Sequence, residues 1–288
     1  MSVDVQTCYR HPDRRAGVTC QRCDRPICPS CMHQASVGFH CPECTKVGRQ
    51  KVVTARNFGA LNRPIATQVL IGINVAVFLA GMSGGGNQLG LDAQSRFTEN
   101  FGLIAEGQLQ SGKLVGVAHG EWYRLISAGF LHAGLLHVGM NMFALWILGS
   151  QLERVIGSTR FVVIYMATLL TASFGVMLVS PNELTVGASG AIFGLLGFAL
   201  AYQLDRGVNV MQSGLGGVLL INLAITFGIP GISIGGHLGG LVGGFLCGQL
   251  VYKLGPRLKS DVVVNVLCGA LGVLCLFGGI IAAQAAVG

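Results

Sequence analysis

Long apolar stretches alternate with short polar connections along most of the chain after residue 64. Seven such stretches lie at about residues 65–82, 135–152, 160–180, 188–204, 214–230, 234–252 and 262–284. A helix that crosses the hydrocarbon core of a bilayer needs about 20 mostly apolar residues, with a range of about 17–25. All seven stretches meet this length. The pattern therefore predicts an all-α polytopic membrane protein.

Residues 83–134 form a long connection between the first two apolar stretches. This segment carries charges of both signs and the aromatic pair Trp122 and Tyr123. Aromatic and charged side chains together are typical of the membrane interface. We expect an interfacial loop with short amphipathic helices, although a plain exposed loop fits the sequence as well.

Composition narrows the protein class further. The chain has 288 residues, of which 51% are hydrophobic and 11% are charged. Soluble domains carry about 25% charged residues, so an ordinary soluble enzyme is excluded, and so is a disordered chain. The net charge is +7, and ten of the nineteen Lys and Arg residues lie in residues 1–63. We attribute this asymmetry to membrane orientation and expect no nucleic-acid partner.

The basic residues also alternate along the connections between apolar stretches. The connections near 153–160, 205–206 and 253–259 carry Lys or Arg, whereas those near 181–187 and 230–233 carry none. Because cytoplasmic connections are enriched in Lys and Arg, we expect a multi-pass protein of the cell membrane. Its N-terminus would be cytoplasmic, and its C-terminus and the long connection would be extracellular.

The N-terminal 45 residues contain four pairs of metal-ligand residues, each pair separated by two residues. The pairs are Cys8 and His11, Cys20 and Cys23, Cys28 and Cys31, and Cys41 and Cys44. Eight Cys and His ligands are the number that two tetrahedral zinc ions require. Disulfides are the alternative, but a cytoplasmic location disfavours them. We therefore expect two zinc ions, whose binding stabilises this short segment.

This segment resembles B-box-type zinc fingers, in which the ligand pairs alternate. The resemblance implies one zinc at Cys8, His11, Cys28 and Cys31, and another at Cys20, Cys23, Cys41 and Cys44. Sequential pairing and replacement of Cys41 by His40 remain alternatives. Because a closed four-ligand site has no open position for catalysis, we expect a regulatory module that binds a cytosolic protein, or a passive folding cap.

Polar side chains inside apolar stretches are costly and are therefore candidates for function. His137 and Asn141 lie four residues apart and share one helix face, so both can donate to a single oxygen atom. His132 lies just before that helix. Hydrogen bonding between helices is the structural alternative for the pair.

A second candidate feature is the tetrapeptide Gly187-Ala188-Ser189-Gly190. It places a serine hydroxyl beside the free N–H groups of a helix start, which can stabilise an oxyanion. A surface of small residues for helix packing is the alternative.

A third candidate is His237, which shares a helix face with Gly240 and Gly244. These glycines allow a neighbouring helix to approach the imidazole closely. A serine hydroxyl needs a base to become a nucleophile, and neutral imidazole is the usual base near pH 7. Because the acidic residues lie at the ends of the apolar stretches, we expect a Ser–His dyad of Ser189 and His237 without an orienting carboxylate.

From about residue 60 to residue 288, the chain resembles the rhomboid intramembrane serine proteases. The residues that carry the resemblance occur in the family's order: Trp122, Arg124, His132, His137, Asn141, Gly187, Ser189, Gly190, His237, Gly240 and Gly244. The resemblance implies a core of six helices, with Ser189 as nucleophile and His237 as general base. It also implies an oxyanion site formed by His137, Asn141 and the N–H of Ser189.

The resemblance assigns further roles around this dyad. His132, Gly187 and Gly190 would support the site. Phe193 stands where some members carry a tyrosine that stacks on the base, and a phenyl ring donates no hydrogen bond there. A seventh helix and the zinc module are additions to the six-helix core, as in actinobacterial forms.

The expected organisation has four parts: a zinc-binding module at 1–45, a basic linker at 46–63, a catalytic core at 64–256 and an additional helix at 257–288. The expected activity is hydrolysis of peptide bonds in or near the transmembrane segments of single-span membrane proteins, with no cofactor needed for catalysis. A non-catalytic rhomboid-like protein that binds membrane helices under control of its zinc module is the main alternative. Binding of haem or ions by the membrane histidines is another. For Cys247, Cys268 and Cys275, we expect apolar packing.

Overall fold

The computed structural model describes residues 6–47, 63–82, 96–109 and 112–288. The chain divides into two compact units, Met1–Leu61 and Asn62–Gly288. Most of the predicted basic linker, residues 48–62, lies outside the described residues.

The N-terminal unit is built from very short elements around its cysteines. Strand β1 (Val18–Thr19) pairs antiparallel with β2 (Pro26–Ile27), and β3 (His33–Gln34) pairs antiparallel with β4 (Phe39–His40). The 3-10 helix η1 (Pro29–Cys31) and helix α1 (Pro42–Val47) complete the described part. Among residues 6–47, the buried apolar side chains are five cysteines and Ile27. So small an apolar core gives little hydrophobic stabilisation. The cysteines themselves therefore form most of the buried interior of this unit.

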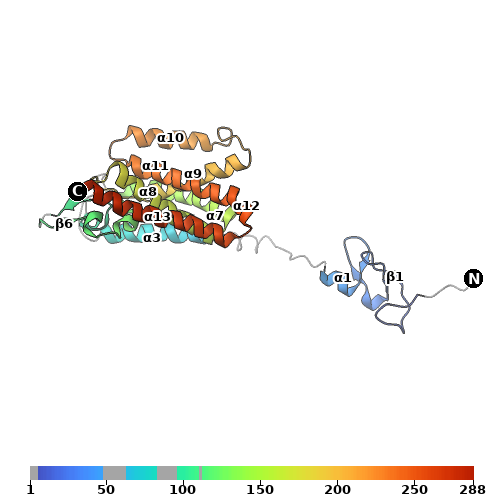
Figure 1. Ribbon diagram of the computed structural model, residues 1–288. Helices are drawn as coiled ribbons and strands as arrows, with labels where there is room; N and C mark the ends of the chain where they lie inside the picture. Colours follow the sequence, from blue (N-terminus) through green and yellow to red (C-terminus); the bar gives the residue numbers. More distant parts are fainter. Residues whose placement is uncertain (1–5, 48–62, 83–95, 110–111) are drawn as a thin grey trace, which may run out of the picture. The chain divides into compact units, whose positions relative to one another are not determined.

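The second unit is a bundle of apolar helices (Figure 1). In chain order its main helices are α3 (Ile65–Met82), α6 (Leu135–Ala144), α7 (Ser150–Ile156), α8 (Ser158–Val179), α9 (Ser189–Asp205), α10 (Leu215–Gly228), α11 (Ile234–Gln249), α12 (Gly255–Leu258) and α13 (Asp261–Val287). A π-helical turn, η4 (Leu145–Gly149), joins α6 to α7, and another, η5 (Leu250–Leu254), joins α11 to α12. Helix α9 packs against α11 and α8, and α13 packs against α8.

Five helices in the described part of the chain are long and apolar enough to cross a membrane. They are Ile65–Met82, Leu135–Ile156, Ser158–Val179, Ile234–Leu258 and Asp261–Val287. The polytopic helical fold predicted from the sequence is thereby confirmed. Helix α13 is the additional seventh helix of that prediction.

Helix α9 has the predicted length of 17 residues and is displaced by one residue, whereas α10 has 14 residues and is shorter than predicted. At about 1.5 Å per residue, α9 extends about 25 Å, whereas the hydrocarbon core is about 30 Å thick. Gly187 has φ +130°, so α9 starts only after this residue. Helix α10 starts after Gly214, with φ +85°, and ends before Pro230, which disfavours helical backbone in the residue before it.

Glycines let α11 approach α9 and α8 closely. A Cβ atom on Gly240 would overlap the carbonyl oxygen of Gly190, and one on Gly244 would overlap that of Gly194. Such backbone contact between membrane helices requires small residues at the crossing. The crossing brings the first turn of α11 against the first turn of α9.

The long connection folds into short elements, as one of the two expectations proposed. Its described part contains α4 (Arg96–Phe101), the hairpin of β5 (Gly107–Gln108) and β6 (Leu114–Val115), the 3-10 helix η2 (Val117–His119), α5 (Arg124–Ser127) and the 3-10 helix η3 (Ala128–Phe130). Residues 83–95 and 110–111 lie outside the described residues.

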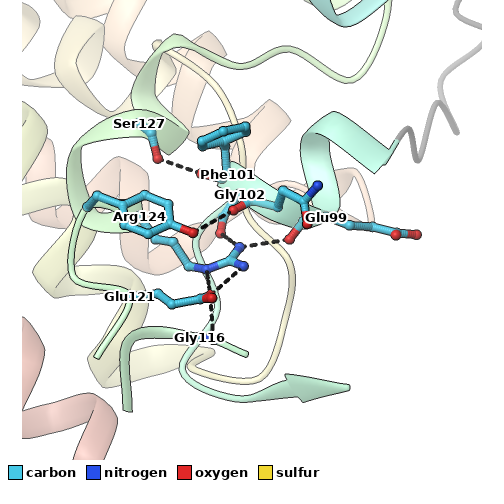
Figure 2. Close-up of polar contacts among 9 residues, drawn as sticks. Glu99, Phe101, Gly102, Gly116, Glu121, Arg124 and Ser127 are labelled. Carbon is cyan, nitrogen blue, oxygen red and sulfur yellow. Dashed lines mark hydrogen bonds and ion pairs between the residues drawn. The ribbon is translucent and has the colours of Figure 1, made fainter. Parts of the chain in front are cut away.

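A buried arginine holds this connection together (Figure 2). Arg124 is 1% exposed, and its guanidinium donates to the carbonyl oxygens of Glu99 and Gly102 at 2.8 and 2.7 Å. It also contacts the Glu121 carboxylate, which accepts from the backbone N–H of Gly116 at 3.0 Å. Burial acts to raise the pKa of Glu121, but these bonds outweigh it and lower that pKa. Arg124, which the sequence predicted in an interfacial loop, is therefore a buried side chain that links Glu121 to the backbone of Glu99 and Gly102.

Candidate active site

Ser189 and His237 lie next to each other although 48 residues separate them. The Oγ of Ser189 is 2.9 Å from Nε2 of His237. Ser189 is the first residue of α9, and His237 lies in the first turn of α11. The glycine crossing of the two helices sets this distance, which is that of a nucleophile and its base.

Two further contacts fix the imidazole of His237. The ring of Phe193, one turn after Ser189, stacks on it with centroids 4.0 Å apart and an interplanar angle of 15°. The Nδ1 atom lies 2.7 Å from the hydroxyl of Thr226 on α10. Nothing in the sequence distinguishes Thr226, because a single threonine in an apolar helix resembles any other.

The backbone at the start of α9 offers free donors beside the serine. The first intrahelical bond runs from the N–H of Ile192 to the carbonyl oxygen of Ala188, at 3.0 Å. The N–H groups of Ser189, Gly190 and Ala191 therefore precede the helical ladder. They can stabilise negative charge that develops next to the serine.

His137 presents a hydrogen-bond donor to the same space. Its Nδ1 accepts from the backbone N–H of Ala133 at 3.3 Å, so the proton of the neutral ring lies on Nε2. A Cβ atom on Gly187 would lie 2.8 Å from His137 Nε2 and 3.6 Å from Ser189 Oγ. The ring, the glycine and the serine thus border one small space, which a side chain at residue 187 would fill.

Asn141 lies one turn further along the helix that carries His137. It is buried, and its amide nitrogen donates one hydrogen to the carbonyl oxygen of His137 at 2.9 Å. A primary amide carries two hydrogens, so one remains for a second acceptor.

His132 and Gly190 support this arrangement by packing. The ring of His132 is buried and meets that of His137 edge-on, with centroids 5.1 Å apart. Burial and then the proximity of His137 lower the pKa of His132 to about 3, so this ring is neutral near pH 7. A Cβ atom on Gly190 would lie 2.5 Å from Cβ of Ala172 and 3.3 Å from the carbonyl oxygen of Gly236, so only glycine fits there.

The N-terminal unit gathers its ligand residues into two clusters. One consists of Cys8, His11, Cys28 and Cys31, and the other of Cys20, Cys23, Cys41 and Cys44, with all ligand atoms of a cluster within 4.8 Å of one another. The ligand pairs therefore alternate, and the sequential pairing is wrong. His40 lies in β4 opposite His33 and belongs to neither cluster.

The separations within the clusters fit a tetrahedral metal ion. Metal–sulfur bonds of about 2.3 Å place the ligand atoms about 3.8 Å apart. The Sγ atoms of Cys23 and Cys41 are 3.8 Å apart, and His11 Nδ1 lies 3.3, 3.5 and 3.9 Å from the sulfurs of Cys31, Cys28 and Cys8. Burial and the neighbouring sulfurs raise the pKa of Cys31 to about 11. A cation would allow such crowded thiols to ionise together.

The remaining cysteines lie apart from these sites. Cys247 and Cys268 are buried where α11 meets α13, with Cys268 Sγ 3.9 Å from the carbonyl oxygen of Cys247, and Cys275 is partly buried. Trp122 is half exposed.

Comparisons with known proteins show which family the chain resembles. Residues 119–254 match the rhomboid domain. The chain is 33% identical over 218 residues to the rhomboid protease GluP of Bacillus subtilis, and the match covers 71% of this chain and 39% of GluP. It is 36% identical over 151 residues to the rhomboid-family protein YdcA of the same organism, covering 51% of this chain and 76% of YdcA.

A plant protein is also similar to part of this chain. The mitochondrial RHOMBOID-like protein 6 of Arabidopsis thaliana is 38% identical over 137 residues, which cover 46% of this chain and 44% of the relative. Ser189, His237, His137 and Asn141 all fall within the matched domain, whereas the cysteine clusters precede it. The chain is therefore a multi-pass membrane protein that belongs to the rhomboid family.

Proposed function

We propose that this protein is an intramembrane serine endopeptidase that cleaves single-span membrane proteins in or near their transmembrane segments. The observation that carries the proposal is the distance of 2.9 Å between Ser189 Oγ and His237 Nε2. Its neighbours are donors suited to an oxyanion, and GluP, which is similar to most of this chain, is named as a rhomboid protease.

In the proposed reaction, His237 Nε2 takes the hydroxyl proton while Ser189 Oγ bonds to the substrate carbonyl carbon. The oxyanion accepts hydrogen bonds from His137 Nε2–H, the free amide hydrogen of Asn141 and the N–H of Ser189. The C–N bond then breaks, and the leaving amine takes the proton from His237. Water repeats the sequence on the acyl-enzyme, with His237 again as base.

The substrate must present an accessible peptide carbonyl. In an intact membrane helix every such carbonyl is hydrogen-bonded and covered, so we expect cleavage where small or helix-weakening residues loosen the helix. With the N-terminus in the cytoplasm, the start of α9 lies toward the extracellular side, where water can reach it. The protein would then act at the cell membrane.

For the N-terminal unit, we propose that each cysteine cluster holds one zinc ion. The ions would cross-link a segment whose apolar core is too small to fold alone. Because all four positions around each ion are filled, the unit has no catalytic part in this proposal. A B-box-like module of this kind would bind a cytosolic protein partner.

The test is cleavage of a model single-span substrate by purified protein in liposomes. Ser189→Ala and His237→Ala are each expected to abolish cleavage while the protein still inserts. Ser150→Ala is the matched control, because it removes a hydroxyl that is buried in the helical unit away from the dyad. Undiminished cleavage by either dyad variant would refute the mechanism. Binding of the substrate without cleavage by the wild type would favour a non-catalytic helix-binding protein.

A further inference from the structure

Helix α10 has one buried polar side chain among residues that face outward. It lies at the edge of the helical unit, beyond α9 and α11 (Figure 1). Its apolar residues Leu220, Ile221 and Phe227 are each about 60% exposed. Thr226, by contrast, is 1% exposed. Its hydroxyl is 2.7 Å from Nδ1 of His237, so α10 contacts the catalytic base directly.

The hydroxyl of Thr226 has a single hydrogen, and this determines which group donates in the contact between Thr226 and His237. A threonine hydroxyl has one hydrogen, and that of Thr226 is donated to the carbonyl oxygen of Asn222 at 2.7 Å. The Thr226 oxygen can then only accept a hydrogen bond from His237. Nδ1 of the imidazole therefore carries the ring proton and donates it to Thr226. In the neutral ring Nε2 has the lone pair, which is the form that accepts the proton of Ser189.

We propose that Thr226 is a positioning residue that holds His237 in the tautomer and orientation needed for a general base. This inference rests on the proposed function. An orienting group at Nδ1 has the same task in Ser–His–Asp triads, where it is a carboxylate. In this protein the orienting group is the neutral hydroxyl of Thr226, which lies on another helix and is held by the carbonyl of Asn222. The dyad becomes a chain of hydrogen bonds: Ser189 to His237, His237 to Thr226 and Thr226 to Asn222.

The contacts around the ring show why this hydroxyl matters. Phe193 covers one face of the imidazole but donates and accepts no hydrogen bond. Stacking fixes the plane of the ring and leaves the proton free to occupy either nitrogen. The contact with Thr226 removes that freedom. Because Thr226 comes from α10, the base is held in its reactive form only while α10 is seated against α11.

The test compares two substitutions in the full-length protein in liposomes. Thr226→Val keeps the shape and removes the hydroxyl, and Thr226→Ser keeps the hydroxyl. Loss of one hydrogen bond worth about 1.4 kcal/mol corresponds to about a tenfold loss. We expect Thr226→Val to lower kcat about tenfold with KM unchanged, and Thr226→Ser to stay within about threefold of the wild type. Thr171→Val is the control, since Thr171 is buried in α8 and its hydroxyl bonds to the carbonyl of Thr168.

A second measurement reads the tautomer without catalysis. In 15N NMR spectra of histidine-labelled protein, the His237 signals are those that disappear in His237→Ala. We expect the proton on Nδ1 in the wild type and a shift toward the other tautomer in Thr226→Val. A wild-type proton on Nε2, or unchanged kcat in Thr226→Val, would overturn the proposal, and so would a serine variant as impaired as the valine variant.

Failure of the proposed function would look different. If the wild type showed no cleavage that Ser189→Ala removes, the peptidase mechanism would fall. The NMR measurement would still decide whether Thr226 sets the tautomer of His237.

Discussion

At the scale of single residues, hydrogen bonds hold the neutral rings of His137 and His237 in different tautomers. His137 accepts at Nδ1 from the N–H of Ala133 and is left with a donor at Nε2. His237 donates at Nδ1 to Thr226 and is left with an acceptor at Nε2. His137 can therefore donate a hydrogen bond to an oxyanion, and His237 can accept the proton of a hydroxyl group. Residue spacing predicted that these residues are functional candidates, but their partners depend on tertiary contacts that spacing does not contain.

The second hydrogen of the Asn141 amide leads to a prediction at this scale. We expect Asn141→Ala to lower the cleavage rate by about 10²–10³, because an oxyanion donor is lost. Asn74→Ala is the matched control: Asn74 is also buried, and its amide donates to the carbonyl four residues earlier, that of Leu70. The control should cleave at the wild-type rate. Equal rates for Asn141→Ala and the wild type would remove Asn141 from the mechanism.

At the scale of elements, glycine spacing and helix length were predictable to different degrees. The spacing of His237, Gly240 and Gly244 predicted a face that another helix approaches, and α9 lies against it. The apolar runs predicted the long helical segments of the second unit, but not the short helices of the N-terminal unit or of the long connection. They did not predict the early end of α10, because the extended backbone at Ile229 decides it.

The crossing of α9 and α11 leads to a second prediction. A methyl group on Gly244 would meet the backbone of Gly194, so Gly244→Ala should push the helices apart, at a cost of about 1–3 kcal/mol. We expect a lower melting temperature and reduced cleavage. Gly217→Ala in α10 is the control, because open space surrounds that position and alanine favours the helix. A Gly244→Ala variant as stable and active as Gly217→Ala would show that the close approach is not needed.

At the scale of the whole molecule, two units of different physical character share one chain. The helical unit is held by apolar and small-residue packing, whereas the N-terminal unit has sulfur clusters in place of a core. The spacing of the cysteines predicted the ligand residues, and the resemblance to zinc fingers predicted their alternating pairs. The sequence left sequential pairing open, because only the folded chain shows which pairs meet.

The clusters lead to a prediction about metal content. We expect two zinc ions per chain in purified protein, measured by elemental analysis, and about one in Cys20→Ser. Cys275→Ser, outside both clusters, should keep two. Cleavage should continue in Cys20→Ser, since no metal ligand belongs to the dyad. Equal zinc content in Cys20→Ser and Cys275→Ser would contradict the assignment of the ligands.

In the proposed mechanism, His237 makes Ser189 a nucleophile inside the membrane unit. The most direct measurement is reaction of the membrane-embedded protein with a fluorophosphonate, followed by mapping of the modified peptide. We predict a single adduct on Ser189 in the wild type, and none on this residue in His237→Ala. An unmodified Ser189 in the wild type, or equally rapid modification in His237→Ala, would contradict the claim.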